Sequence, residues 1–193
     1  MTMTLSRCCW VPSTNALYVA YHDNEWGVPC HDERRLFEML NLEGAQAGLS
    51  WSTILNKQAT YRLAFDDWDA RKIALYDADK VAQLLADPGI VRNRLKIAAA
   101  ITNARAYLRL CDDEGGLDAY LWGFVGGVPV QGGIAAAPTK TTLSDQLSKD
   151  LLKRGFKFVG STIVYAYLQG IGVVNDHAPH CHLYAGTGSA PLP

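Results

Sequence analysis

Three histidines and a cysteine lie within ten positions near the end of the chain, in NDHAPHCHLY at 175–184. His177 and Cys181 are four residues apart, a spacing that lets two side chains reach one point. Imidazole nitrogen and thiolate sulfur are ligands that zinc prefers, and a closed structural site needs four such ligands. The stretch contains no C-x-x-C pair, so the other ligands must come from elsewhere in the chain.

Further ligands for such a site are available near the beginning of the chain. The candidates for a tetrahedral site with two sulfur and two nitrogen ligands are Cys8 or Cys9, His22, Cys181, and one of His177, His180 and His182. The residue types alone do not choose between these alternatives. A site of this kind would join the two terminal segments. Because four protein ligands leave no open position for water, its metal would be structural and not catalytic.

A second group of residues combines a carboxylate with aromatic rings. Its members are Tyr18, Tyr21 and Trp26 in LYVAYHDNEWG (17–27), with Glu43 and Trp51 in LEGAQAGLSW (42–51). Aromatic faces stack on flat rings, and cation–π attraction together with a carboxylate favours a ring that carries positive charge. Each of these aromatic residues could instead belong to the core, and Glu43 could be an exposed helix residue. As a group they predict a pocket for a flat, cationic ring.

A third feature is the segment LLKRGFKFVGSTIVYAYLQGIG at 151–172, which predicts two helices joined by a short hydrophobic turn. Gly160 precedes the second helix, as in helix-hairpin-helix elements, where backbone N–H groups at a helix N-terminus bind a phosphate. The basic residues in or near this segment are Lys149, Lys153, Arg154 and Lys157, and a second basic stretch holds Arg92, Arg94 and Lys96. Affinity for DNA comes largely from phosphate electrostatics, so the pattern indicates DNA binding through Lys157 and Gly160.

The rest of the chain predicts helices that would position these groups. Apolar periodicity and helix-forming composition indicate helices at 32–48, 50–65, 69–76, 79–86, 92–110, 117–125, 143–155 and 160–172. Asp32 and Ser50 are expected N-caps. The Gly- and Pro-rich segment 126–142 predicts one long loop, and no segment alternates like a strand. The expected fold class is all-α. A single helical domain at 7–184 would lie between a flexible N-terminus (1–6) and a disordered tail (185–193).

Composition narrows the class of protein. The 193 residues are 49% hydrophobic and 19% charged with a net charge of −1, which is typical of one globular domain. No apolar run approaches the roughly 20 residues that span a bilayer, and the first residues lack the apolar core of a signal peptide. The five cysteines are an odd set that suits a reducing compartment better than a disulfide framework. We therefore expect a cytoplasmic protein with no membrane partner.

Six stretches of the chain carry a family resemblance. They are CCWV (8–11), LYVAYHDNEWGVP (17–29), LFEMLNLEGAQAGLSW (36–51), GIVRNRLKI (89–97), NARAYL (103–108) and LSKDLLKRGFKFVGSTIVYAYLQGIGVVNDHAPHC (147–181). Together they resemble the bacterial family of 3-methyladenine DNA glycosylase I, from about residue 7 to residue 184. The resemblance implies an all-helical member of the helix-hairpin-helix glycosylase superfamily. It also implies one structural zinc per chain, bound by Cys8, His22, His177 and Cys181. A non-cysteine usually stands in the family at the position of Cys9.

The resemblance further implies the reaction. The enzyme would flip a 3-methyladenine nucleotide out of double-stranded alkylated DNA and hydrolyse its glycosidic bond, releasing free 3-methyladenine and leaving an abasic site. Alkylation at N3 makes the base cationic, so its departure as a neutral molecule needs little acid catalysis. By the same resemblance Glu43 is the active-site carboxylate, and Tyr18, Tyr21, Trp26 and Trp51 surround the base. It stays open whether Glu43 acts in the chemistry or in recognition, and whether 3-methylguanine is also a substrate.

Two neighbouring positions bear on the type of glycosylase. Related glycosylases use an aspartate after the hairpin, and Asp176 lies near that place. Because it is next to a predicted zinc ligand, we expect it to be structural. Lyases form a Schiff base through a lysine after the hairpin glycine, where this chain has Ser161 and Thr162. We therefore expect a monomeric, monofunctional hydrolase.

Two other classes of protein are compatible with parts of the pattern. A zinc deaminase needs an open metal position with H-x-E and P-C-x-x-C, whereas this chain has His22-Asp23-Asn24-Glu25 and no C-x-x-C. A non-catalytic DNA-binding module stapled by zinc would leave the aromatic group around Glu43 without a purpose. An assay for base release from alkylated DNA separates all three classes.

Overall fold

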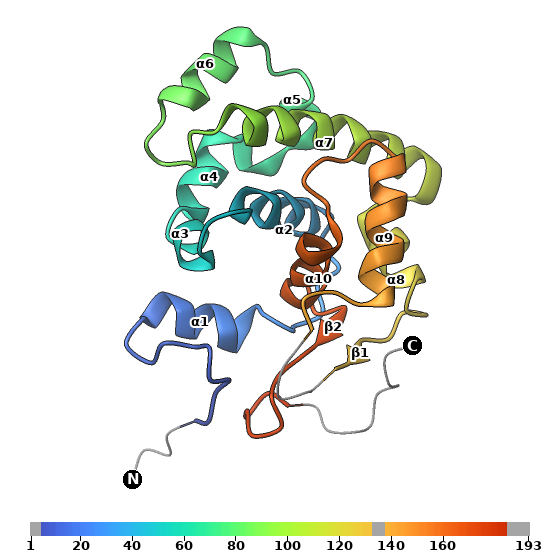
Figure 1. Cartoon of the computed structure of the whole chain (residues 1–193). Coiled ribbons are helices and arrows are strands. Elements are labelled where there is room, and N and C mark those ends of the chain that lie inside the picture. Colours follow the sequence, from blue (N-terminus) through green and yellow to red (C-terminus); the bar gives the residue numbers. More distant parts are fainter. Residues whose placement is uncertain (1–4, 133–137, 185–193) are drawn as a thin grey trace.

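The computed structural model describes residues 5–132 and 138–184. Their elements, shown in Figure 1, are α1 (Ala16–Asn24), α2 (Glu33–Gln46), α3 (Trp51–Leu55), α4 (Gln58–Ala64), a 3-10 turn (Asp66–Trp68), α5 (Ala70–Ile73), α6 (Ala78–Ala86), α7 (Arg94–Glu114), α8 (Leu117–Gly123), β1 (Val130–Gln131), α9 (Thr142–Lys153), α10 (Ser161–Gly170) and β2 (Val174–Asn175). No helix in this part of the chain is long and apolar enough to cross a membrane. The predicted tail at 185–193 lies outside the described residues.

Helix α2 runs through the middle of the molecule and is covered by α3, α7, α8 and α10 (Figure 1). It begins where predicted, at the N-cap Asp32, whose side chain accepts a hydrogen bond from the backbone N–H of Arg35 at 2.7 Å. Every residue from 36 to 45 is buried. The helix therefore buries polar side chains as well as apolar ones, Glu43 among them. The alternative of an exposed Glu43 is wrong.

The first helix was not predicted. Helix α1 begins after Asn15, whose side chain accepts a hydrogen bond from the N–H of Tyr18 at 3.1 Å. Its sequence, ALYVAYHDN, places apolar residues all around the helix, so it has no apolar stripe. The helix matters because it carries Tyr18, Tyr21 and His22.

The expectation of a wholly helical chain is wrong in one detail. Two strands of two residues each form a parallel pair, with Val130 opposite Val174 and Gln131 opposite Asn175. β1 lies inside the segment 126–142 that was predicted as one long loop, of which residues 133–137 are not described. Strands this short have no room for the alternation that reveals a strand in a sequence. The pair fixes the chain just before His177.

Two of the differences from the predicted helix boundaries have a visible local cause. The predicted helix 50–65 is divided into α3 and α4, because the side chain of Asn56 donates to the carbonyl of Ser52 at 2.8 Å and competes with the helical backbone. Ser50 is the N-cap of α3, as predicted. Helix α7 continues past residue 110 to Glu114 and ends at Gly115, whose φ of +84° suits a glycine.

Helices α9 and α10 form an antiparallel pair joined by the turn 154–160 (Figure 1). Phe156 and Val159 of this turn are buried, and the hydroxyl of Ser148 donates to the carbonyl of Val159 at 2.7 Å. The turn also lies against α2, since a Cβ added at Gly44 would be 3.1 Å from the Cβ of Phe158. The hairpin is therefore fixed to the helix that carries Glu43.

Candidate functional site

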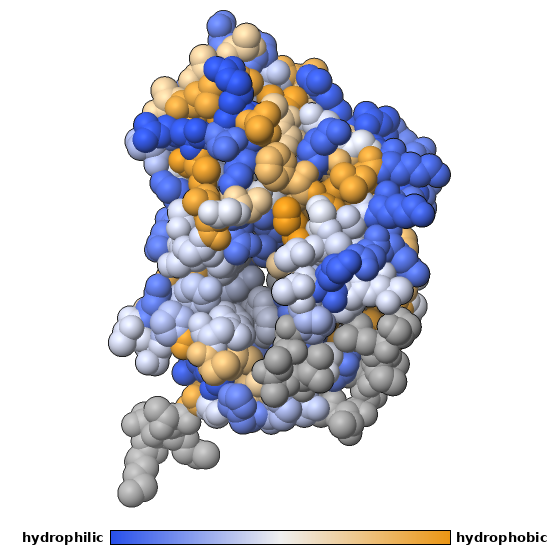
Figure 2. Space-filling view, viewed as in Figure 1, coloured by the Kyte–Doolittle hydropathy of each residue, from blue (hydrophilic) through white to orange (hydrophobic). Residues whose placement is uncertain are grey.

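A cavity of about 300 Å³ opens between α1, α3 and α10, with α2 as its floor. Figure 2 shows this face of the molecule hollowed there. All five residues predicted for a ring-binding pocket line the cavity: Tyr18, Tyr21, Trp26, Glu43 and Trp51. They come from α1, the segment after it, α2 and α3, so the structure brings together residues that are far apart in the sequence. Their roles in binding a base stay predictions.

The aromatic side chains form a wall with one open face. The rings of Tyr21 and Trp51 have centroids 5.2 Å apart at 46°. Trp10 meets Trp26 edge to face at 4.8 Å and belongs to the same wall. Trp51 is half-buried, and its buried Nε1 has no hydrogen-bond partner among the described residues. A flat ring can therefore enter beside Trp51 without breaking a hydrogen bond.

Glu43 differs from the other buried polar residues of α2. Glu38 is paired with Arg62 at 2.7 Å, and the amide of Asn41 donates to the carbonyl of Phe37 at 2.8 Å. Glu43 is also buried, with only 4% of its surface exposed, but no described residue makes a hydrogen bond to its carboxyl. Burial raises its pKa from 4.5 to about 8. The group is thus largely protonated at neutral pH until a cation or a donor enters the cavity.

Several cavity residues were missed by the sequence analysis, namely Trp10, Gln46, Ala166 and Gln169. Asp176, which was expected to be structural, also lines the cavity. Its Oδ2 accepts hydrogen bonds from the Tyr165 hydroxyl at 2.5 Å and from Gln169 Nε2 at 2.6 Å. Ala166 and Gln169 are three apart and share a face of α10. The sequence could not reveal that face, because apolar residues occur around most of this helix.

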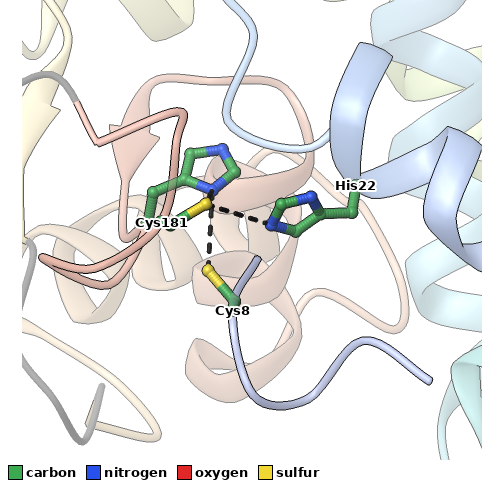
Figure 3. Close-up of side chains that lie close together, drawn as sticks. Cys8, His22 and Cys181 are labelled. Carbon is green, nitrogen blue, oxygen red and sulfur yellow. Dashed lines mark hydrogen bonds between the residues drawn. The ribbon is translucent and has the colours of Figure 1, made fainter. Parts of the chain in front are cut away.

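The four predicted metal ligands meet at a single point between the two ends of the described chain. Cys8, His22, His177 and Cys181 are all buried, and one ligand atom from each lies within 4.8 Å of the others. Figure 3 shows Cys8, His22 and Cys181 converging. The Sγ of Cys181 is 3.5 Å from His22 Nε2 and 3.5 Å from His177 Nδ1, and Cys8 Sγ is 3.6 Å from His177 Nδ1.

These distances can be tested against zinc geometry. A tetrahedral zinc with bonds of about 2.3 Å to sulfur and about 2.0–2.1 Å to nitrogen requires sulfur and nitrogen ligands to be about 3.6 Å apart. The cluster therefore has the ligand types and spacing that suit zinc. It also separates the alternatives left open by the sequence, since Cys9, His180 and His182 are exposed and lie outside the cluster.

The second nitrogen of each histidine ring has its own partner. His22 Nδ1 is 2.7 Å from Asp23 Oδ1, and Asp23 is held in turn by Arg7 at 2.6 Å. His177 Nε2 is 3.1 Å from the carbonyl of Trp26, to which it can donate. These partners leave His22 Nε2 and His177 Nδ1 with their lone pairs directed at the cluster. Burial lowers the pKa of His177 to about 4, so the ring is neutral, as a metal ligand must be.

The hairpin residues predicted to bind DNA are on the surface. Lys157 is exposed, and a Cβ added at Gly160 would meet nothing within 4 Å. Helix α10 has no side-chain cap at its N-terminus, so backbone N–H groups are accessible there. Two of the predicted basic residues are engaged elsewhere. Arg154 pairs with Asp150 at 2.6 Å, and Lys96 Nζ donates to the carbonyls of residues 45 and 47 at the end of α2.

Comparison with known proteins agrees with this architecture. The family model described as methyladenine glycosylase matches residues 10–184. DNA-3-methyladenine glycosylase 1 of Escherichia coli (strain K12) is 49% identical over 185 residues, which are 94% of this chain and 98% of that protein. A crystal structure of 3-methyladenine DNA glycosylase I, 49% identical, superposes with a TM-score of 0.89 and covers 93% of this chain and 100% of its own.

A second solved structure concerns base recognition directly. It is the 3-methyladenine DNA glycosylase I of Staphylococcus aureus, described as showing the structural basis of 3-methyladenine recognition. It is 35% identical with a TM-score of 0.88, and it covers 92% of this chain and 96% of its own. The family model and these relatives span nearly the whole described chain, with its cavity, Cys/His cluster and hairpin. The chain belongs to the methyladenine glycosylase family of enzymes.

Proposed function

We propose that this protein excises 3-methyladenine from alkylated double-stranded DNA by hydrolysis and leaves an abasic site. The observation that carries the proposal is Glu43, a buried carboxyl without a hydrogen-bond partner among the described residues, at the floor of an aromatic cavity. A neutral polar ligand could hydrogen-bond to that carboxyl but would not favour its ionised form. A cationic ring with N–H donors satisfies the buried carboxyl and stacks on the aromatic wall at the same time.

The chemistry follows from the charge of the substrate. A nucleotide methylated at adenine N3 carries a positive charge that is lost when the base departs. The flipped base stacks beside Trp51, and its charge lowers the pKa of Glu43 and favours the carboxylate. Glu43 then accepts hydrogen bonds from the base while water attacks C1′ of the sugar, the C1′–N9 bond breaks, and the proton of the water passes to solvent. Recognition of the cation is the main role of Glu43, because the leaving group needs little further protonation.

The cavity supports hydrolysis without lyase activity. A bifunctional glycosylase attacks the sugar with an amine and forms a Schiff base. No lysine lines the cavity within the residues that the structure describes. The positions after Gly160 are Ser161, whose hydroxyl is 2.9 Å from that of Ser144, and Thr162. The abasic site therefore stays uncleaved.

DNA binding is assigned to the turn 154–160 and the N-terminus of α10. The accessible N–H groups after Gly160 can bind a phosphate, and Lys157 adds a positive charge beside them. Helix α10 begins at this turn and carries Gln169, a cavity residue, near its other end. The contact between Gly44 and Phe158 fixes the turn to α2 next to Glu43. Phosphate contact and base cavity thus belong to one rigid unit.

An apolar side chain is available to fill the place of the flipped nucleotide. Leu49 is 40% exposed on the turn between α2 and α3, between the cavity residues Gln46 and Trp51. Gly48 directly before it has a φ of +77° and makes the turn tight. Proteins that unstack DNA insert apolar side chains of this kind between bases. We assign that role to Leu49.

Zinc is assigned a structural role in a monomeric protein. Cys8, His22, His177 and Cys181 would hold the ion, and four protein ligands leave no position for a catalytic water. The bound ion would supply cross-linking of the terminal segments. Cys8 also lines the cavity, so the cross-link would keep one wall of the base site in place.

The test is base release from duplex DNA that carries methylated adenine. We expect free 3-methyladenine, an abasic site without strand cleavage, and no protein–DNA adduct on borohydride reduction. Glu43→Gln keeps the shape of the side chain but removes its charge. A hydrogen bond to a charged group contributes about 1.5–3 kcal/mol, so the single-turnover excision rate should fall about 10–150-fold. Absence of release by the wild-type protein would overturn the proposal. A borohydride adduct would refute the hydrolytic mechanism.

A second experiment separates DNA binding from base binding. Lys157→Glu should weaken DNA affinity and lower the slope of its salt dependence by about 1, while affinity for free 3-methyladenine stays the same. Lys72→Glu, on α5, makes the same charge change on a different exposed surface and serves as the control. Equal effects of the two substitutions on DNA affinity would contradict the assignment to the hairpin.

A further inference from the structure

One polar side chain of the cavity, Gln169, is held by a second residue of the cavity lining, Asp176. The amide nitrogen of Gln169 donates to Asp176 Oδ2 at 2.6 Å, and the Tyr165 hydroxyl donates to the same oxygen at 2.5 Å. The other oxygen of Asp176 is buried, and a Cβ added at Gly132 would lie 1.7 Å from it. The carboxyl is therefore confined on both sides. Its contacts leave it one orientation.

This arrangement decides which way the Gln169 amide points. If the amide turned over, its oxygen would face Asp176 Oδ2, and two acceptors would be in contact. Gln169 Oε1 must therefore point away from Asp176. It accepts no hydrogen bond from a described residue, and it is not among the buried polar atoms that lack a partner, so it faces open space. Because Gln169 lines the cavity, that space is where a base would lie.

A fixed acceptor in the cavity can distinguish two bases that charge cannot. Methylation at N3 makes both adenine and guanine nucleotides cationic, so Glu43 and the aromatic wall attract both. The edges of the two bases differ. Adenine has an amino donor at position 6, whereas guanine has a carbonyl acceptor there. An acceptor facing that edge forms a hydrogen bond with adenine and repels guanine.

We infer that Gln169 sets the preference for adenine over guanine among N3-methylated bases, and that Asp176 is the residue that positions it. The inference rests on the proposed base-excision function and deepens it. Gln169 Oε1 accepts a hydrogen bond from the base in the cavity. Asp176 does not touch the base and acts only through the orientation of the Gln169 amide.

The test measures the ratio of 3-methyladenine to 3-methylguanine released by the enzyme. Duplex DNA methylated with dimethyl sulfate contains both 3-methyladenine and 3-methylguanine, and the released bases are separated by chromatography. Gln169→Met keeps the length of the side chain and removes the acceptor. One neutral hydrogen bond corresponds to about a 2- to 10-fold change. We expect 3-methyladenine excision to fall by this factor while 3-methylguanine excision is unchanged or rises, so that the ratio drops by at least about 2- to 10-fold.

Asp176→Ala should lower the same ratio even though Gln169 is still present, because the amide can then rotate. Asp176→Asn retains an acceptor oxygen for Gln169 Nε2 and should restore the ratio. Tyr165→Phe removes the other donor to Asp176 and should leave the ratio at the wild-type value. A general loss of stability lowers both excision rates together and does not change their ratio. Zinc content is measured for each Asp176 variant, because His177 is its neighbour.

The outcomes separate the inference from the function on which it rests. Absence of 3-methyladenine release by the wild-type protein would mean that the proposed function has failed. If the wild-type protein releases 3-methyladenine and Gln169→Met leaves the ratio unchanged, the inference about Gln169 is wrong and the function stands. If Gln169→Met lowers the ratio but Asp176→Ala does not, the positioning role of Asp176 is wrong.

Discussion

The Cys/His cluster and the aromatic cavity are adjacent, but they differ in whether their buried polar groups have hydrogen-bond partners. In the cluster each histidine has a partner for its second nitrogen, Asp23 for His22 and the Trp26 carbonyl for His177. In the cavity the buried residue Glu43 has no hydrogen-bond partner for its carboxyl among the described residues, and Trp51 Nε1 is a buried atom without one. A buried polar group without a partner costs stability. The hydrogen bonds of the cluster fix the orientation of its side chains, whereas polar groups of the cavity remain free to hydrogen-bond to a ligand.

The two regions nevertheless share residues. Trp26 lines the cavity, and its ring meets His177 edge to face at a centroid distance of 4.7 Å. Gly27, directly after it, has a φ of +75°, and a Cβ there would be 2.9 Å from His177 Nε2. Cys8 belongs to both regions. The Cys/His cluster therefore holds in place two residues of the cavity lining, Cys8 and Trp26.

The largest expected effect comes from removing a cluster ligand. His177→Ala should abolish stoichiometric zinc, which we expect at about one per chain, and destabilise the protein, because metal binding contributes directly to folding. For a chain of this size the melting temperature should fall by about 10 °C or more. Metal analysis and thermal unfolding measure both. His180→Ala removes an exposed histidine that lies outside the cluster and is the control. Wild-type protein purified without chelators that contains no zinc would contradict the prediction.

Replacing the Glu43 carboxyl, which has no hydrogen-bond partner among the described residues, should stabilise the protein, in contrast to His177→Ala. The pKa of Glu43 is near 4.5 in an unfolded chain and about 8 in the folded protein. Between these values the unfolded chain has lost the proton that the folded protein still binds, so the stability due to this group is present below pH 4.5 and lost as the pH rises through 8. Glu43→Gln does not titrate. Its stability relative to wild type should therefore increase from pH 5 to pH 8.5, by an amount on the order of 2–4 kcal/mol.

Denaturant unfolding of both proteins at several pH values measures this difference. Glu38→Gln provides a contrast, because that carboxyl is paired with Arg62 and Arg35 and its loss should destabilise the protein. If the difference between Glu43→Gln and wild type does not change with pH, Glu43 is not held protonated in the folded protein.

Features that depend on neighbouring residues could be predicted from the sequence, whereas features that depend on distant residues could not. The helices at 32–48 and 92–110 were predictable because long apolar stripes and capping residues are local signals. The four predicted metal ligands have no local signal that joins residues 8 and 22 to residues 177 and 181, and this set of four came from the family resemblance. Helix α1 was missed for lack of an apolar stripe. Gln169 was missed because its significance depends on Asp176, Tyr165 and Gly132, which only the folded chain brings together.

Trp51→Ala should have an intermediate effect, confined to the cavity. Stacking on an aromatic side chain contributes about 1–3 kcal/mol per base, so affinity for free 3-methyladenine should fall about 5- to 150-fold. Because Trp51 is half-buried at the rim, the change should cost little stability and no zinc. Calorimetric titration with the free base and metal analysis test the two statements. Unchanged affinity would mean that the base does not stack on Trp51.

The smallest expected effect is that of Cys9→Ser, and it tests where the boundary between the two regions lies. Cys8 is 3% exposed with its sulfur in the cluster, whereas the adjacent Cys9 is exposed and lies outside it. Exposed substitutions usually change stability by less than about 0.5 kcal/mol. Cys9→Ser should therefore keep full zinc content and a melting temperature within about 2 °C of wild type.

Cys8→Ser makes the same chemical change one residue earlier and is the matched partner of this variant. It should lose zinc, because a serine hydroxyl does not replace a thiolate ligand at a buried site. Since Cys9 faces the cavity and cannot reach the cluster without moving the segment that also carries Trp10, it should not take over as a ligand. Zinc loss in Cys9→Ser with retention in Cys8→Ser would reverse the assignment. In that case the exposed Cys9, and not the buried Cys8, would be the zinc ligand.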